Sequence, residues 1–263
     1  MNKHKKYDAS SIEVLEGLEP VRRRPGMYIG GTDNASMHHL FSEVIDNAMD
    51  EAVANFASFI EVKVETDNTI SIYDNGRGIP IDPHPNFPDK SALEVIMTTL
   101  HAGGKFSNKV YQTSGGLHGV GISVVNALSE FVDVEVYRDK KIYNQKFSKG
   151  HPTSKLKEIK KKTNKKGTKI SFKPDPEIFG PDNNFNCNKL YDFSKSKAYL
   201  FAGVEIRWFC DSEISKKENI PENDIFKFSQ GLIDLVQNEV DEKMSLLSEI
   251  FSGNREKDKN NLS

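Results

Sequence analysis

A glycine-dense segment that opens into a helix is the feature that most limits what this chain can be. Residues 115–121 read Gly-Gly-Leu-His-Gly-Val-Gly and run directly into the apolar stretch 122–128. Glycines let the backbone approach an oxyanion, and the first N–H groups of a helix lack intrahelical partners and lie at the positive end of its dipole. The segment therefore predicts a phosphate-binding site, although a flexible loop would have a similar composition.

Length and composition indicate a globular protein. The 263 residues are enough for one large domain, or one domain and part of another, and 37% hydrophobic with 28% charged residues suits a packed core. The net charge of −2 neither favours nor excludes a polyanionic partner. Cys187 and Cys210 lack metal-ligand spacing and are expected to be reduced thiols. Without an apolar signal segment or a run of about 18 apolar residues, we expect a cytoplasmic protein that does not enter the membrane.

Helical and strand periodicities alternate along the chain. Apolar residues at steps of three and four predict a helix over 34–54, and Ser91 with Glu94 forms a capping box for a helix reaching about Leu100. Further helices are predicted over 121–129 and 187–201. Strands are predicted over 60–65, 70–74, 132–137, 142–147, 169–172 and 204–209, and a short strand followed by an amphipathic helix over 225–251. Residues 1–33 are polar and turn-rich. The four prolines in 79–90 predict a loop, and the glycine-rich span 101–120 predicts a functional lid.

A carboxylate and an amide share one face of the first long predicted helix. Glu43 and Asn47 are four residues apart, so their side chains lie one turn from each other. An amide oxygen can bind Mg²⁺ without adding charge beside a triphosphate, and a glutamate one turn earlier could polarise an attacking water. The alternative is that both residues simply occupy the wet edge of the helix. His39 could orient Glu43, but a surface or packing histidine is an equally good interpretation.

The segment 74–80 fits recognition of a purine base. Asp74 ends a predicted strand, and Gly76 and Gly78 follow at alternate positions, so a carboxylate could accept from an exocyclic amino group while the base lies against the backbone. A simple β-turn is the competing interpretation. Other groups that could complete the site are the apolar wall of Ile79, Pro80 and Ile96, the hydroxyl of Thr168, and Lys105 as a phosphate counter-charge.

One segment is strongly basic. Nine lysines and one acid, Glu158, lie between Lys155 and Lys173. Such a segment is either a nucleic-acid contact or a solvated hairpin tip. Without arginine or aromatic residues among the lysines, any contact with nucleic acid would be non-specific and sensitive to salt.

Taken together, these segments resemble the signature motifs of the GHKL ATPase superfamily, which includes gyrase, Hsp90, histidine kinases and MutL. Residues 7–30, 99–106 and 114–129 resemble, more narrowly, the B subunits of bacterial type II topoisomerases, and the resemblance covers nearly all of 7–210. Residues 105–112 and 82–85 are more similar to the topoisomerase IV branch than to gyrase.

This resemblance implies an α+β fold, a two-layer sandwich with a mixed sheet, helices on one face, and ATP held between the helices and a glycine-rich lid. It implies an ATPase domain over 1–220 with a dimerisation arm over about 1–30, followed over 221–263 by the start of a transducer domain. The transducer lysine that touches the γ-phosphate in the family has no counterpart in this sequence, so we expect weak ATPase activity.

The resemblance also assigns roles to residues. It implies that Glu43 is the general base, with His39 beside it, that Asn47 is the Mg²⁺ ligand, and that Asp74 reads adenine. Arg138 matches a position at the outer pocket where coumarin-type inhibitors bind. The remaining expected nucleotide contacts are Tyr7 (which would reach the partner's nucleotide), Arg77, Gly78, Ile79, Pro80, Ile96, Gly103, Gly104, Lys105, Tyr111, Gly115, Gly116, Leu117, His118, Gly119, Val120, Gly121, Ile122 and Thr168.

The expected function is therefore Mg²⁺-dependent ATP hydrolysis coupled to dimer closure and DNA strand passage, with a topoisomerase A subunit and DNA as partners. Three alternatives stay open at this point. The chain could belong to a gyrase, it could be an ATP-gated clamp with negligible hydrolysis, or it could be a chaperone or mismatch-repair protein of the same superfamily.

Overall fold

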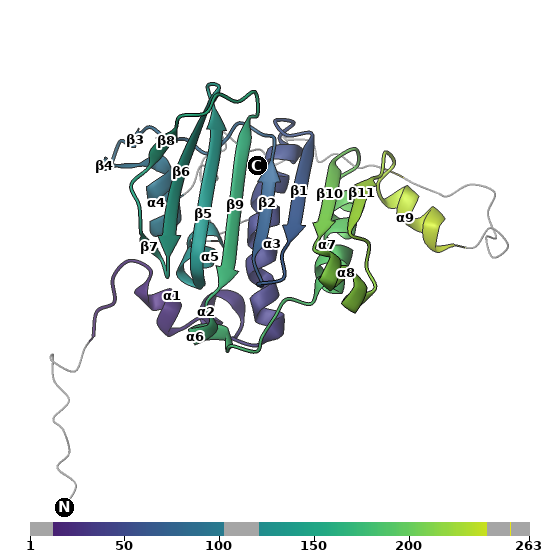
Figure 1. Ribbon diagram of the computed structural model, residues 1–263, viewed down its shortest axis with the longest axis horizontal. Helices are drawn as coiled ribbons and strands as arrows, with labels where there is room; N and C mark the ends of the chain where they lie inside the picture. Colours follow the sequence, from purple (N-terminus) through teal and green to yellow (C-terminus); the bar gives the residue numbers. More distant parts are fainter. Residues whose placement is uncertain (1–12, 103–120, 241–252, 254–263) are drawn as a thin grey trace, which may run out of the picture.

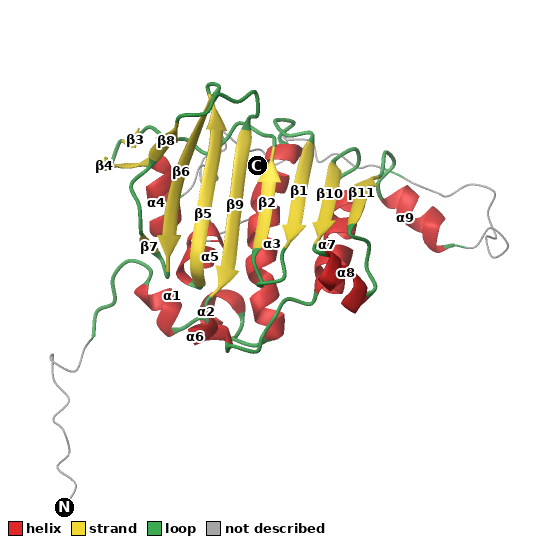
Figure 2. Cartoon of the chain, in the orientation of Figure 1, coloured by secondary structure: helices red, strands yellow, loops and turns green. Residues whose placement is uncertain are grey.

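The computed structural model describes residues 13–102, 121–240 and Gly253, and these form a two-layer sandwich. Figure 1 shows a broad twisted sheet with helices α3 (Asn34–Val53), α4 (Ala92–Thr98), α5 (Gly121–Ala127) and α7 (Cys187–Leu200) on one face. The predicted two-layer α+β arrangement is confirmed. Figure 2 shows the same division between a layer of strands and a layer of helices.

The sheet is mixed and has nine strands in the described part of the chain. Its order is β11-β10-β1-β2-β9-β5-β6-β7, with β8 also paired to β6. Strands β1 and β10 run parallel and the other pairs are antiparallel. The strand bounds are β1 Phe59–Val64, β2 Ile70–Asp74, β5 Ser129–Arg138, β6 Lys141–Ser148, β7 His151–Pro152, β8 Lys157–Ile159, β9 Gly167–Pro174, β10 Glu205–Cys210 and β11 Asn223–Lys227.

Helix α3 is the central element of the helical layer. The Asp33 side chain caps it by accepting from the Ser36 N–H at 2.8 Å, which satisfies one of the first unpaired donors. Its apolar stripe packs onto β1, β2 and β9, as the periodicity predicts, and comprises Met37, Leu40, Phe41, Val44, Ile45, Ala48, Met49 and Ala52. The opposite edge of the helix is left for polar side chains.

The predicted capping box at Ser91 is only half formed. The Ser91 hydroxyl accepts from the Glu94 N–H at 3.1 Å, but the Glu94 carboxylate accepts from Gln145 Nε2 at 2.8 Å instead of returning to the cap. The start of a helix was therefore predictable from the sequence. The hydrogen bond of the Glu94 side chain was not, because its partner Gln145 lies on strand β6, which is distant in sequence.

Several short elements depart from the sequence prediction. The expected loop over 79–90 contains a hairpin of β3 (Pro83–His84) and β4 (Phe87–Ser91), and β7 and β8 had no clear pattern. The predicted helix over 121–129 ends at Ala127, because Ser129 begins β5 and its hydroxyl bonds back to the Val125 carbonyl at 2.6 Å. Short helices were also missed at α1 (Glu19–Arg23), α2 (Gly26–Ile29), α6 (Pro176–Phe179) and α8 (Ser212–Glu218).

The sheet continues past residue 220. Strand β11 pairs antiparallel with β10 and forms an edge of the sheet, and α9 (Leu232–Glu239) follows it. The predicted domain boundary at 220 therefore falls just before an edge strand, and the division into two domains stays a prediction. No helix in the described ranges is long and apolar enough to cross a bilayer.

Candidate active site

Asp74 ends strand β2 at the centre of the sheet and is almost fully buried, with 5% of its surface exposed. Its Oδ1 accepts from the Gly76 N–H at 2.8 Å. Burial raises the pKa of Asp74 to about 7, and repulsion from Glu51 adds to the shift while the Gly76 N–H opposes it. A buried carboxylate of this kind gains from a ligand that brings a hydrogen-bond donor.

A set of polar and backbone contacts surrounds this carboxylate. Thr168 on β9 pairs directly with Asp74, and its Oγ1 accepts from the Ile79 N–H at 3.1 Å. The same loop is held from β5, where Arg138 Nη1 donates to the Gly78 carbonyl at 3.2 Å. Residues expected on separate segments are therefore brought together around 74–79.

Two glycines make this packing possible. Gly167 has φ +113°, and a Cβ there would lie 1.9 Å from the Asp74 carbonyl oxygen. Gly78 has φ +78°, and its Cβ would lie 3.1 Å from both Arg138 Cγ and the Gly167 carbonyl oxygen. Because the backbones of β2 and β9 meet so closely, only glycine fits at 167. The sequence alone did not predict this role for Gly167, because a positive φ leaves no mark in a single sequence.

Glu43 lies against the start of helix α5. A Cβ on Gly121 would lie 1.8 Å from Glu43 Oε2 and 2.8 Å from Glu43 Cδ, so the carboxylate occupies the space that this glycine leaves. Helices α3 and α5 pack together along this contact. The structure thus places the predicted general base beside the N-terminus of the helix that follows the glycine-rich segment.

Asn47 is half-buried one turn further along α3, and its amide makes no hydrogen bond within the described part of the chain. Glu51 follows after another turn and was missed by the sequence analysis. Its Oε2 accepts from the Arg77 N–H at 2.9 Å and lies 2.7 Å from where a Gly76 Cβ would be. The equal spacing of 43, 47 and 51 was the available signal, because it places all three on one polar stripe of the helix.

Arg77 lies at the exposed rim of the site. Its guanidinium pairs with Glu51 at 2.6 Å and stacks over the Phe56 ring, with 3.7 Å from Cζ to the ring centroid. These contacts hold the segment after β2 against the end of α3. A direct contact between Arg77 and nucleotide stays a prediction.

The positions of the other predicted site residues neither support nor contradict the roles expected for them. His39 is exposed, one turn before Glu43, whereas its neighbour His38 bridges to 186 through its ring, which accepts from the Asn186 N–H at 3.1 Å. Ile79, Ile96 and Ile122 are half-buried and Pro80 is exposed. The following predicted residues lie outside the described part of the chain: Tyr7, Gly103, Gly104, Lys105, Tyr111, Gly115, Gly116, Leu117, His118, Gly119 and Val120.

The lysine-rich segment forms β8, the turn after it and β9. Its lysines from 155 to 166 are exposed, and Lys169 and Lys173 pair with Glu135 and Glu130. This placement fits both interpretations of the segment. Cys187 and Cys210 are free thiols whose pKa values burial raises, to about 12 and about 11.

A buried carboxylate at the end of a sheet strand, glycines that open space beside it, and a second carboxylate at the start of a helix define a nucleotide-binding α+β sandwich. The chain belongs to the family of histidine kinase-, DNA gyrase B- and HSP90-like ATPases, which it matches over residues 32–178.

Individual relatives show which branch of this family the chain is most similar to. The chain is 58% identical to the B subunit of DNA topoisomerase 4 from Bartonella bacilliformis, over 94% of this chain and 36% of that protein. It is 56% identical to the corresponding protein of Rickettsia prowazekii, over 97% of this chain and 39% of that protein. Identity to the B subunit of DNA gyrase from Thermotoga maritima is 48%, over 88% of this chain and 35% of that protein. The predicted order of resemblance, topoisomerase IV before gyrase, is confirmed.

A solved structure supports the fold. The 43K ATPase domain of Thermus thermophilus gyrase B, crystallised in complex with an aminocoumarin, superimposes with a TM-score of 0.72 at 39% identity, covering 84% of this chain and 54% of that one. The chain spans little more than a third of the length of the curated relatives it matches.

Proposed function

We propose that this chain binds ATP together with Mg²⁺ and hydrolyses its γ-phosphate, as the ATPase part of a topoisomerase IV B subunit. The single observation that carries the proposal is the Asp74 carboxylate, buried at the end of β2 with one oxygen held by the Gly76 N–H. A buried acceptor with remaining lone pairs is suited to the amino group of adenine, because pairing offsets the cost of its desolvation.

The surroundings of Asp74 support selection of a purine. Thr168 Oγ1 already accepts from the Ile79 N–H, so its proton is available to a ring nitrogen of the base. Half-buried Ile79 provides an apolar surface beside it. Guanine presents a carbonyl where adenine presents its amino group, so it offers the Asp74 carboxylate no hydrogen-bond donor at that place.

At the phosphate end, Glu43 is suited to hold and polarise the attacking water. Its carboxylate lies against Gly121, at a helix start that also favours phosphate oxygens. Asn47 fits a Mg²⁺ ligand, since its half-buried amide offers a neutral hard oxygen that the described residues leave unpaired. When bound, Mg²⁺ would neutralise charge on the phosphates.

The wider function rests on the relatives. We propose that ATP closes a dimer through the N-terminal arm, and that the assembled protein acts with a topoisomerase A subunit on DNA in the bacterial cytoplasm. We also propose that Arg138, which donates to the Gly78 carbonyl, borders a site for coumarin-type inhibitors.

Titration calorimetry with ATP, ADP and GTP in the presence of Mg²⁺, followed by phosphate release on the same sample, tests the proposal. We expect ATP and ADP to bind and GTP to bind far more weakly. Binding without phosphate release would favour the ATP-gated clamp, and equal affinity for GTP would overturn the assignment of Asp74.

A further inference from the structure

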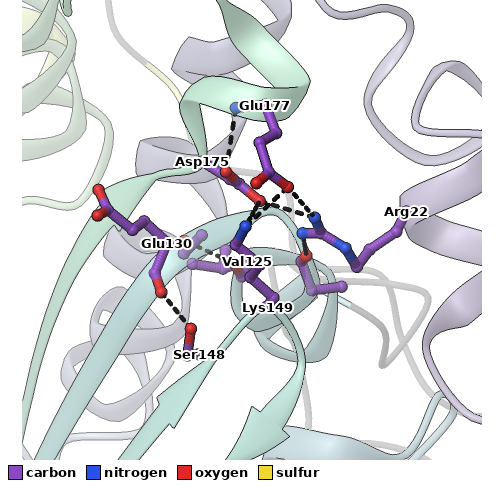
Figure 3. A network of polar contacts seen from close by, with 9 residues as sticks. Arg22, Val125, Glu130, Ser148, Lys149, Asp175 and Glu177 are labelled. Atoms are coloured by element: carbon purple, nitrogen blue, oxygen red, sulfur yellow. Dashed lines mark hydrogen bonds and ion pairs between the residues drawn. The ribbon is translucent and has the colours of Figure 1, made fainter. Parts of the chain in front are cut away.

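We infer that Arg22 and Asp175 are positioning residues for the phosphate end of the active site, because they fix the far end of helix α5. The inference rests on the proposed nucleotide-binding function. Figure 3 shows the cluster, in which Arg22 of α1, Lys149 of the turn after β6, and Asp175 and Glu177 at the start of α6 point toward one another. None of these residues belongs to the site around Asp74 and Glu43.

Arg22 contacts α5 directly. Its Nη1 donates to the Ala127 carbonyl at 2.7 Å, and Ala127 is the last residue of the helix. The last carbonyls of a helix lack intrahelical partners and carry partial negative charge, so a guanidinium is well suited to hold them. Through its Nη2, the same guanidinium reaches Asp175 Oδ2 at 2.7 Å.

Asp175 completes the contact from the other side. Its side chain is 1% exposed, and its backbone N–H donates to the Leu128 carbonyl at 2.9 Å, one residue beyond the helix. Its Oδ1 caps α6 by accepting from the Glu177 N–H at 3.0 Å. Asp175 thus holds both the chain leaving α5 and the guanidinium that grips the helix end.

The outer members of the cluster are more exposed. Lys149 pairs with Glu177 at 2.7 Å, and Glu177 is mostly exposed, so solvent screens this pair. Glu177 also lies 3.6 Å from Arg22 Nη2. It therefore provides a control that belongs to the same network but touches neither α5 nor the chain that leaves it.

Helix α5 links this cluster to the active site. It has seven residues, so its ends are about 10 Å apart. Its first residue, Gly121, lies so close to the Glu43 carboxylate that a Cβ atom on this residue would collide with it. Because Ser123 to Ala127 are all buried, a shift at the held end would be passed to Gly121 rather than absorbed by bending. Loss of the Arg22–Asp175 contact should therefore displace the phosphate end and leave the adenine end in place.

The test compares two ligands on matched variants. Arg22→Lys and Asp175→Asn are the test variants. A lysine cannot hold the Ala127 carbonyl and Asp175 with two separate nitrogens as the guanidinium does, and Asp175→Asn keeps the shape of the side chain but removes the charge that pairs with Arg22. Arg23→Ala, whose ion pairs with Glu13 and Glu19 are exposed, and Glu177→Ala are the controls. Affinity for a non-hydrolysable ATP analogue with Mg²⁺, and for adenosine alone, would be measured well below each variant's melting temperature.

We expect the two test variants to lose roughly 5- to 20-fold in affinity for the ATP analogue, with less than about twofold change for adenosine, within the usual range of coupling energies between linked groups. Both controls should stay within about twofold of the unmodified chain for either ligand. Unchanged affinity for the analogue with a lowered melting temperature would show a purely structural role and overturn the inference, as would equal losses for both ligands. Failure of the unmodified chain to bind either ligand would instead overturn the proposed function.

Discussion

Asp74 combines burial with a charge, and its ability to bind adenine depends on both. Asp74→Asn keeps the shape and can still accept from the Gly76 N–H, but it removes the charge and can turn a donor toward the adenine amino group. We expect ATP affinity to fall by about 1–3 kcal/mol, the usual cost of losing a charge-assisted hydrogen bond. Calorimetry with ATP measures this directly, and an unchanged dissociation constant would remove Asp74 from the site.

Glu43 should affect turnover rather than binding. Glu43→Ala, in a form of the protein that hydrolyses ATP, should slow phosphate release by about 10²–10⁴ while nucleotide affinity stays nearly unchanged, because a general base acts mainly in the transition state. Glu43→Gln is the matched control for shape. A loss of affinity with normal turnover would mean that the carboxylate has a different role.

Asn47 should show the converse behaviour. Asn47→Ala removes the proposed neutral Mg²⁺ ligand, so the difference in ATP affinity measured with Mg²⁺ and with EDTA should largely disappear. Asn47→Asp would keep an oxygen at the same place. If Asn47→Ala retains the full effect of Mg²⁺ on affinity, the metal is held elsewhere.

Among the elements, strand β9 and helix α5 each begin at a glycine that has no room for a side chain, but for different reasons. In Gly167→Ala the new methyl group would meet the backbone of β2 and the residue would keep a strained φ, so unfolding should occur at a markedly lower temperature. In Gly121→Ala the methyl group meets a side chain that can move, so the protein should fold while turnover falls as Glu43 is displaced.

Melting curves and phosphate release on both variants check this contrast. Gly203→Ala is the control, since Gly203 has φ +86° but open space around it. Normal turnover in Gly121→Ala would contradict the close placement of Glu43.

Long periodic elements were predictable, and short or contact-dependent ones were not. The stripe on α3 and the alternation in β1 and β5 persist over enough residues to stand out, so their type and approximate bounds follow from the pattern. The hairpin of β3 and β4 has too few residues for any period and contains prolines. Helix α1, at five residues, is held by tertiary contacts of Arg22 and Val21 rather than by propensity.

The site followed the same rule. Glu43, Asn47 and Asp74 stand out in the sequence because each is a polar residue at a place where an apolar element left no packing reason for it, and their roles stay predictions. Glu51 was missed although it continues the spacing of Glu43 and Asn47 along α3. The role of Gly167 depends on how closely β9 approaches β2, and the Arg22–Asp175 contact joins residues 153 positions apart, so neither leaves a local pattern.

At the scale of the whole molecule, the buried charge of Asp74 should cost stability in a manner that depends on pH. An unfolded Asp ionises near pH 4, whereas burial raises the pKa of folded Asp74 to about 7. Below pH 4 the group is protonated in both states and has no effect. Between pH 4 and 7 the unfolded chain releases the proton that the folded protein retains, so stability falls as pH rises, and above pH 7 the cost is constant.

Asp74→Asn removes this titration. Its advantage in unfolding free energy over the unmodified chain should be smallest near pH 4, grow up to about pH 7 and then level off, with a ceiling of about 4 kcal/mol from three pKa units. Urea unfolding of Asp74→Asn and of the unmodified chain at four pH values measures this difference. A difference independent of pH for Asp74→Asn would show that burial does not perturb the carboxylate. The expected result, a variant that is more stable without ligand and binds ATP less well, would show that the fold gives up stability to keep a charged acceptor in place for adenine.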